Sequence, residues 1–148
     1  AKRYNIDPYI IATTAYIESE FSMVSRPCIG IMQILYSTYK SDYSKTGYDP
    51  YTLEGNIALG AIELRDHLYT QNIIDRSKIL DRHKAYMFGR YNGSGKNSRY
   101  TKKAMITLNR IKTESISKLK ERMKKGKVWN KKKESKCSPF FSNTMAKC

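Results

Sequence analysis

The sequence predicts an all-α fold, and three observations carry that prediction. Apolar residues recur at helical spacing along most of the chain, and no stretch shows the strict alternation typical of a half-buried strand. The 148 residues include only 4 Pro and 8 Gly, which suits a helical domain better than a disordered or fibrous chain. The length is enough for one domain with a core. We expect a helical domain over residues 1–125 and a basic tail over residues 126–148.

The first predicted helix carries the clearest candidate for a catalytic residue. Asp7 as N-cap and Pro8 at the first helical position begin a helix that runs to about Phe21, because the missing N–H of proline costs nothing there. The apolar face of this helix ends at Glu18, whereas Glu20 points elsewhere. A carboxyl group at the edge of a core tends to have a raised pKa, which a general acid needs.

Four more helices are expected along the chain. They run from Ile29 to about Tyr43, from Leu53 to Leu68, from Ser77 to about Tyr91 and from Tyr100 to about Lys125. The helix from Leu53 has the most regular apolar period, and Gly60 within it allows close packing. The turn-forming residues 91–95 separate the last two helices.

Most of the formal charge of +15 belongs to the end of the chain. Residues 1–95 hold 11 Lys and Arg against 10 Asp and Glu, whereas residues 96–148 hold 17 against 3. The basic segment predicts contact with an anionic wall polymer or a membrane surface. Nucleic acid is not expected as a partner, because the segment has no known motif and few interleaved aromatic residues. The plainer alternative is a solvated helix face with a frayed tail.

Cysteine and histidine usage argues against a metal site. The cysteines Cys28, Cys137 and Cys148 form no Cys-x-x-Cys motif, and the two histidines lie 16 residues apart. We therefore expect no metal and no other cofactor. Three cysteines allow one internal disulfide. A Cys137–Cys148 bridge closes the shortest loop, but we prefer a bridge from the tail to Cys28, because a short Lys-rich segment has little else to order it.

Four short motifs occur in an order that resembles one enzyme family. The motifs are Glu18-Ser19-Glu20-Phe21, Gly30-Ile31-Met32-Gln33, Asn56-Ile57 followed by Gly60, and Tyr91-Asn92-Gly93 with Tyr100 spaced like a following tyrosine. Over roughly residues 4–111 they resemble the lytic transglycosylase domain of soluble lytic transglycosylases and goose-type lysozymes. The resemblance implies a lysozyme-like helical fold, with residues 1–125 as the catalytic domain.

The resemblance also implies a reaction, cleavage of the β-1,4 bond between N-acetylmuramic acid and N-acetylglucosamine in peptidoglycan. Most glycosidases use two carboxyl groups, but no Asp or Glu lies between Glu20 and Gln33. With Glu18 as a single acid and then base, the substrate's acetamido oxygen would stabilise the reacting carbon and the C6 hydroxyl would attack it. We therefore predict a lytic transglycosylase with a 1,6-anhydro product, rather than a goose-type lysozyme-like hydrolase.

The family pattern implies roles for further residues. Glu18 and Tyr91 are the expected catalytic residues, with Tyr91 orienting Glu18 or the acetamido group. The expected substrate-binding residues are Ser25, Met32, Gln33 and Asn92. Each has a plainer alternative: Glu18 would pair with Arg26, Tyr91 would be a core aromatic residue, and Gln33 would be a buried amide satisfied by backbone.

Peptidoglycan lies outside the cytoplasmic membrane, so we expect an extracytoplasmic enzyme in the periplasm or cell wall, where a disulfide persists. We expect it to act as a monomer on glycan strands. The rival function is a weakly catalytic glycan-binding component of a secretion or conjugation machine. The presence of Glu18 favours an enzyme.

Overall fold

Four α-helices build the part of the chain that the structure describes. The computed structural model describes residues 2–24, 27–35, 40–41, 43–71, 79–114, 118 and 121. The α-helices are α1 (Pro8–Ser19), α3 (Leu53–Tyr69), α4 (Asp81–Tyr91) and α5 (Arg99–Thr113), and a short 3-10 helix, η1 (Lys2–Tyr4), precedes them. Within these ranges the only β-type pairing is one isolated bridge, so the all-α prediction is confirmed for them. The expected basic tail lies outside the described residues.

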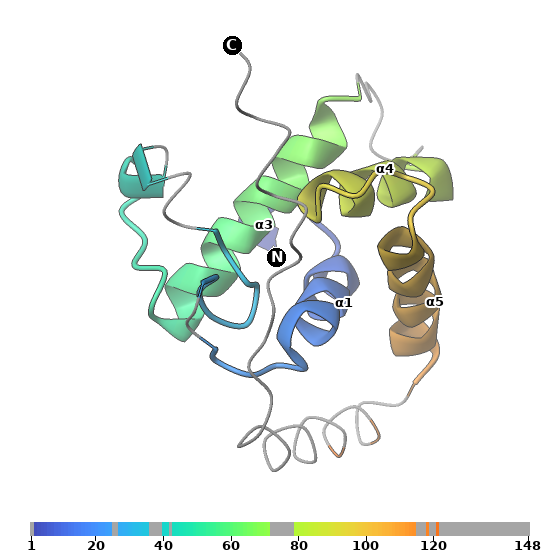
Figure 1. Ribbon diagram of the computed structural model, residues 1–148, viewed down its shortest axis with the longest axis horizontal. Helices are drawn as coiled ribbons and strands as arrows, with labels where there is room; N and C mark the ends of the chain where they lie inside the picture. The colour runs from blue at the N-terminus through green and yellow to red at the C-terminus, as the bar shows by residue number, and fades with distance from the viewer. Residues whose placement is uncertain are drawn as a thin grey trace.

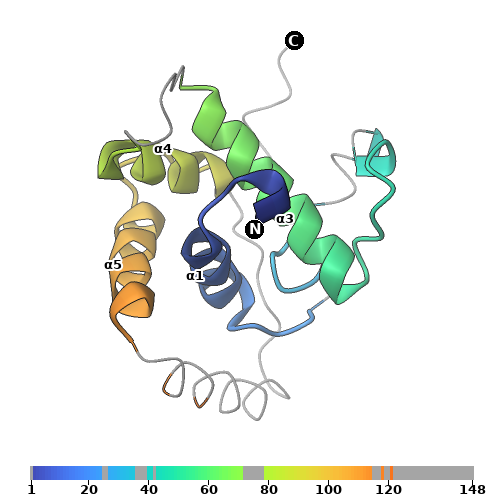
Figure 2. The ribbon, with the colours of Figure 1, turned by 180° about the vertical axis from the view of Figure 1, so that it is seen from behind.

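The helices are arranged around α1. This helix packs against both α3 and α5, and α4 packs against the same two helices at one end (Figure 1). Seen from behind, η1 lies beside α3, which it contacts (Figure 2). Among the described residues, no helix has both the length and the apolar character needed to cross a membrane.

Helix α1 begins as predicted and ends slightly earlier. The Asp7 side chain accepts a hydrogen bond of 2.9 Å from the backbone N–H of Tyr9, and proline occupies the first turn. The helix ends at Ser19 because Glu20 and Phe21 both take left-handed backbone angles, with φ of 52° and 63°. Glu20 is exposed, as the face assignment predicted.

The predicted helix from Ile29 is wrong over the residues nearest the candidate site. Ile29 and Ile34 exchange two backbone hydrogen bonds of 2.9 Å and close a tight turn. Gly30 and Gln33 have φ of 71° and 51°, which a right-handed helix does not allow. Residues 40–41 and 43–44 are helical, whereas 36–39 and 42 lie outside the described residues.

The later helices follow the predictions with changes at their ends. Helix α3 is confirmed, and α4 begins at Asp81, while residues 72–78 lie outside the described part. Helix α5 ends at Thr113, well before the predicted Lys125, because Glu114 takes an extended backbone with ψ of 141°. Most of the remaining predicted length is not described.

One buried cluster draws on every α-helix and on the turn after α1. It includes Ile10 of α1, Met32 of the turn, Leu64 of α3, Phe88 of α4 and Leu108 of α5, each at most 2% exposed. Burying such side chains stabilises a fold by about 1.5–3 kcal/mol each. The core thus fixes the turn and the four helices relative to one another.

Candidate functional site

The candidate site begins with a buried asparagine that holds the Ile29–Ile34 turn against α3. Asn56 is fully buried, and its side-chain oxygen accepts a hydrogen bond of 2.9 Å from the Met32 N–H. Its amide donates to the Ile29 carbonyl at 2.8 Å and to the Pro50 carbonyl at 3.0 Å. A Cβ added to Gly30 would lie 2.3 Å from this side chain. Two of the four sequence motifs therefore meet in space, and glycine is required at position 30.

Helix α1 is tied to the same turn through the residue after Glu18. The hydroxyl of Ser19 donates to the Ile31 carbonyl at 2.8 Å and to the Ala15 carbonyl at 3.1 Å. The turn also lies close to α3, since a Cβ on Gly60 would approach the Met32 side chain to 2.6 Å. The close packing predicted for Gly60 is thus present, and the end of α1, the turn and α3 form one rigid frame.

Glu18 lies in that frame with an unusual protonation state. Burial raises the pKa of its carboxyl group, the charge of Glu63 adds to this, and the pKa that results from all its neighbours is about 7. The Tyr100 hydroxyl, which donates to Oε1 at 2.5 Å, acts in the opposite direction, as does the charge of Lys103. At neutral pH the carboxyl group is therefore close to half protonated and can both give and take a proton. This agrees with the raised pKa expected from the sequence.

Tyr100 is a site residue that the sequence analysis did not assign. It lies in the first turn of α5, which is capped by the Ser98 side chain accepting from the Thr101 N–H at 3.1 Å. Burial and the neighbouring Glu18 carboxylate raise the pKa of Tyr100 well above its usual value. The phenol therefore stays neutral and acts as a hydrogen-bond donor. Its spacing after the Tyr91 motif was the available signal.

A second carboxyl group, Glu63 of α3, lies near Glu18. Its Oε2 accepts a hydrogen bond of 2.9 Å from the Tyr43 hydroxyl, and its Oε1 is 3.7 Å from Nε2 of His67. The Glu63 side chain is only 15% exposed. Its charge raises the pKa of Glu18, Tyr91 and Tyr100, after the larger effect of burial on each.

The prediction that Glu18 acts as a single acid and base stays a prediction, with a second carboxyl group now placed near it. It considered only the residues near the Gly30–Gln33 motif, whereas Glu63 arrives from α3. The sequence held a signal for it. Asn56, Gly60 and Glu63 are spaced i, i+4 and i+7, which places them on one face of a helix. The first two pack against the turn, so the third faces the same region.

Tyr91 does not contact the Glu18 carboxylate by a hydrogen bond. Its hydroxyl donates to the Met32 carbonyl at 2.7 Å, and the residue is only 5% exposed. Burial raises the pKa of Tyr91 well above its usual value, and the charges of Glu63 and Glu18 add to this. Tyr91 therefore holds the turn from the side of α4. Of the two tyrosines, Tyr100 makes the hydrogen bond to Glu18, and the role expected for Tyr91 stays a prediction.

The predicted substrate-binding residues are placed as follows. The Gln33 side chain donates to the Gly30 carbonyl at 2.6 Å and to the Val24 carbonyl at 3.4 Å, which matches its plainer alternative. Met32 is fully buried, and Asn92 is 7% exposed at the end of α4. Ser25 lies outside the described residues, as does Arg26. None of the described ones is exposed.

The histidines and cysteines add little to the site. Over the residues that the structure describes, no group of three or more His, Cys, Asp or Glu side chains could hold a metal ion. His83 accepts a hydrogen bond from the Leu80 N–H at 3.1 Å and so caps α4. Cys28 is buried at 5% exposure, but Cys137 and Cys148 lie outside the described part, so the disulfide pairing stays a prediction.

Comparisons of this chain with protein-family models, with curated protein sequences and with solved structures found no match. The assignment of a function therefore depends on the motifs and on the geometry around Glu18.

Proposed function

We propose that this chain is a peptidoglycan lytic transglycosylase with a lysozyme-like fold, in which Glu18 is the acid and then the base. The observation that carries the proposal is the partly buried Glu18, which has a pKa of about 7 and accepts a hydrogen bond of 2.5 Å from the Tyr100 hydroxyl. An acid–base group works best when its pKa lies near the working pH. Both protonation states of Glu18 are then populated during one turnover.

The first step is cleavage of the glycosidic bond. Protonated Glu18 gives its proton to the bridging oxygen as the bond from C1 of N-acetylmuramic acid to that oxygen breaks. The substrate's own acetamido oxygen donates electron density to C1, the substrate-assisted route. Tyr100 then stabilises the Glu18 carboxylate, because a hydrogen bond to the charged form is worth about 1.5–3 kcal/mol.

The second step closes the product. The Glu18 carboxylate takes the proton of the C6 hydroxyl while O6 attacks C1 and displaces the acetamido oxygen. The product carries a 1,6-anhydro end, and Glu18 is protonated again for the next cycle. The two steps need no metal ion, no cofactor and no water as reactant.

Glu63 supports a second candidate, a goose-type lysozyme-like hydrolase. In such a reaction a second carboxylate would activate water against C1. We place this candidate second because both oxygens of Glu63 face protein groups, Tyr43 at 2.9 Å and His67 at 3.7 Å. That environment suits a fixed negative charge that keeps Glu18 protonated better than it suits a base for water.

The deciding experiment is digestion of purified peptidoglycan followed by mass spectrometry of the products. A transglycosylase gives 1,6-anhydro ends that are lighter than hydrolysed ends by one water. Mainly reducing ends would move the enzyme to the hydrolase candidate. Glu18→Gln should abolish product, and the exposed Glu20→Gln is the matched control. Substantial turnover by Glu18→Gln would overturn the proposal, and glycan binding by the wild type without product would favour the rival, a weakly catalytic glycan-binding component.

The remaining expectations are part of the proposal. The enzyme would act as a monomer on glycan strands in an extracytoplasmic space, either periplasm or cell wall. The basic tail would add attraction to an anionic wall polymer or a membrane surface.

A further inference from the structure

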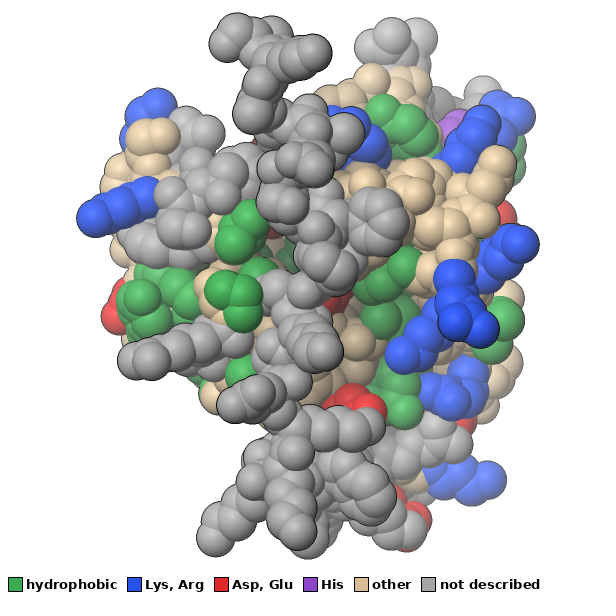
Figure 3. Space-filling model, in the orientation of Figure 1, with side chains coloured by type: hydrophobic (Ala, Val, Ile, Leu, Met, Phe, Trp, Pro, Cys, Tyr) green, Lys and Arg blue, Asp and Glu red, His purple; other side chains and the backbone are tan. Residues whose placement is uncertain are grey.

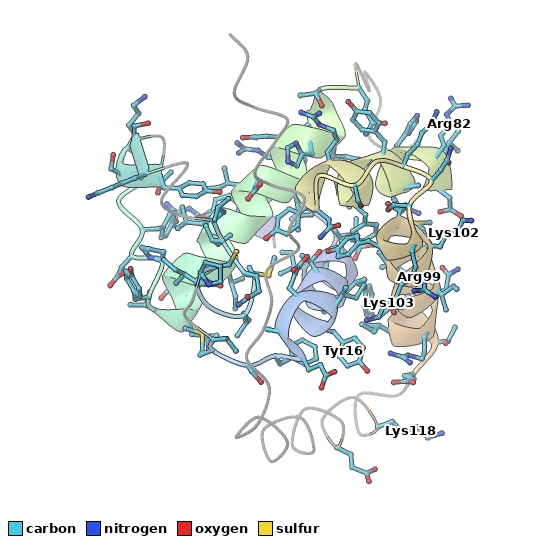
Figure 4. The ribbon with its side chains drawn as sticks, in the orientation of Figure 1. Tyr16, Arg82, Arg99, Lys102, Lys103 and Lys118 are labelled. Atoms are coloured by element: carbon cyan, nitrogen blue, oxygen red, sulfur yellow. The ribbon has the colours of Figure 1, made fainter. Side chains whose placement is uncertain are left out.

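A groove of about 410 Å³ runs between α1 and α5, and most of its charged residues are cations on the α5 side. Helix α1 and its C-cap contribute Tyr16 and Glu20. Helix α5 contributes four cations, Arg99, Lys102, Lys103 and Arg110. We call this feature the α1–α5 groove. Figure 3 shows Lys and Arg side chains gathered on this side of the molecule, and Figure 4 labels three of the α5 cations together with Tyr16.

The cations form one row along α5. Arg99 precedes Lys102 and Lys103 by three and four residues, about one helical turn or roughly 5.4 Å along the axis, and Arg110 follows Lys103 after seven residues, about two turns. The opposite face of the helix is fixed in the core through Ala104, Leu108 and Ile111, each at most 3% exposed. The helix cannot rotate to hide the row without losing those contacts. The row is therefore a permanent feature of the groove.

Three of the four cations have no acidic partner among the residues that the structure describes. Within the described ranges, no salt bridge or side-chain hydrogen bond engages the charged groups of Arg99, Lys102 and Lys103. Arg110 differs, since its guanidinium lies 5.2 Å from the ring centre of Tyr16 and its Nε is 3.8 Å from Glu114. Arg110 thus has a fixed place at one end of the row.

The α1–α5 groove lies next to Glu18, the proposed catalytic residue. The charge of Lys103 lowers the pKa of Glu18, so the row extends to the neighbourhood of the site. A chain held in the groove would lie beside a glycan strand held near Glu18.

We propose that the α1–α5 groove binds a linear phosphodiester polymer that has no stackable bases, such as a polyol phosphate chain. Four cations along one face of a helix match a ligand that carries several charges along a chain, rather than one isolated anion. Arg99 offers the planar fork that pairs with phosphate oxygens, and Lys102 and Lys103 act as point charges. This proposal goes beyond the cleavage reaction and does not depend on it.

The lining of the groove favours a ligand without bases. Proteins that hold single-stranded nucleic acid place aromatic side chains for successive bases to stack on. The groove lining has one aromatic residue, Tyr16, and the guanidinium of Arg110 already covers its ring. Ile106, also in the lining and 70% exposed, offers apolar contact suited to a polyol chain.

The test is direct binding of a synthetic glycerol phosphate oligomer to the full chain, measured by titration calorimetry at several salt concentrations. Parallel titrations use a single-stranded oligonucleotide and a polyglutamate of equal charge. The test variant is Arg99→Gln with Lys102→Gln. The control, Lys40→Gln with Lys45→Gln, removes the same charge from the segment that lies on the other side of the molecule from α5 (Figures 1 and 2). The Glu18→Gln chain should bind equally, which separates this test from the cleavage reaction.

We expect the groove variant to lose about tenfold in affinity or more, with a salt slope reduced by about 1.4–1.8, because each of the two lost phosphate contacts contributes about 0.7–0.9 to that slope. The control variant should change little, and Glu20→Gln should bind more tightly, because it removes the acidic side chain from the groove lining. An equal loss in both double variants would overturn the proposal. So would tighter binding of the oligonucleotide, equal binding of polyglutamate, or no measurable binding at low salt.

Discussion

The hydroxyl of Tyr100 donates a hydrogen bond of 2.5 Å to Glu18, and this contact joins the start of α5 to the end of α1. It opposes the effect of burial, because burial raises the pKa of Glu18 whereas a hydrogen bond to the charged form lowers it. The balance leaves the pKa at about 7. Two helices far apart in the sequence therefore set the protonation of one carboxyl group.

Tyr100→Phe should raise the pKa of Glu18 further, because the lowering contribution is lost and burial remains. The alkaline limb of the activity profile, along which the acid loses its proton, should move to higher pH. Turnover should fall by about tenfold to a hundredfold, since the charged carboxylate loses a bond worth about 1.5–3 kcal/mol. A pH–rate profile measures both effects. Tyr51→Phe, at a residue 62% exposed, is the control and should leave the profile unchanged.

Glu18 should also reduce the stability of the fold at neutral pH. Its pKa is raised from 4.5 to about 7 on folding, so the folded chain holds the proton more tightly than the unfolded chain. Stability contributed by the protonated form is complete below about pH 4.5 and is lost as the pH rises through 7. Glu18→Gln should therefore stabilise the protein above pH 7 by on the order of 1–3 kcal/mol and have little effect at pH 4. Urea unfolding at both pH values measures this, with Glu20→Gln expected to show no such difference.

The sequence predicted the helices better than it predicted the site. The Asp7 cap, the period of α3 and the apolar residues of α5 are local signals, and local hydrogen bonds and burial determine those elements. The segment from Ile29 to Ile34 carries four apolar residues and resembles the start of a helix. Its conformation is instead determined by a contact with a residue far away in the sequence.

That distant determinant is Asn56, whose side chain takes the Met32 N–H and the Ile29 carbonyl out of helical bonding. Such a contact between residues 24 and 27 positions apart has no signal in a local pattern. The same reason explains the missed partners of Glu18. Tyr100 and Glu63 approach it only after α5 and α3 have packed against α1.

Asn56→Ala should therefore destabilise the fold strongly. It would leave the Met32 N–H and the Pro50 carbonyl without the Asn56 side chain and would remove one of the two hydrogen bonds to the Ile29 carbonyl; each buried group left unpaired costs about 1–3 kcal/mol. We expect a loss of about 3 kcal/mol or more in the free energy of unfolding, measured with urea. Asn109→Ala, at an exposed position of α5, should change the stability by less than about 0.5 kcal/mol. Similar effects of the two changes would mean that the turn does not depend on Asn56.

Glu63→Gln tests how the second carboxyl group acts. Its charge acts on Glu18 of α1, Tyr91 of α4 and Tyr100 of α5, and its own partners are Tyr43 and His67. Removing its negative charge should lower the pKa of Glu18, so the alkaline limb of the activity profile should move to lower pH. The amide keeps an oxygen that can accept from Tyr43, so the fold should be retained, which circular dichroism can check.

The product of Glu63→Gln separates the two roles for this residue. If Glu63 acts only as a fixed charge, the variant should still release 1,6-anhydro ends, with turnover reduced most at alkaline pH, where Glu18 is no longer protonated. If Glu63 is instead the base that activates water, the variant should form no reducing ends at any pH, because the hydrolytic step is lost. Suppose that wild-type digests are rich in reducing ends and that these ends disappear in Glu63→Gln. That result would assign water activation to Glu63, and the proposed function would change from transglycosylase to hydrolase. The muropeptide spectra of the wild type and this variant, taken at pH 5 and pH 8, decide between the two.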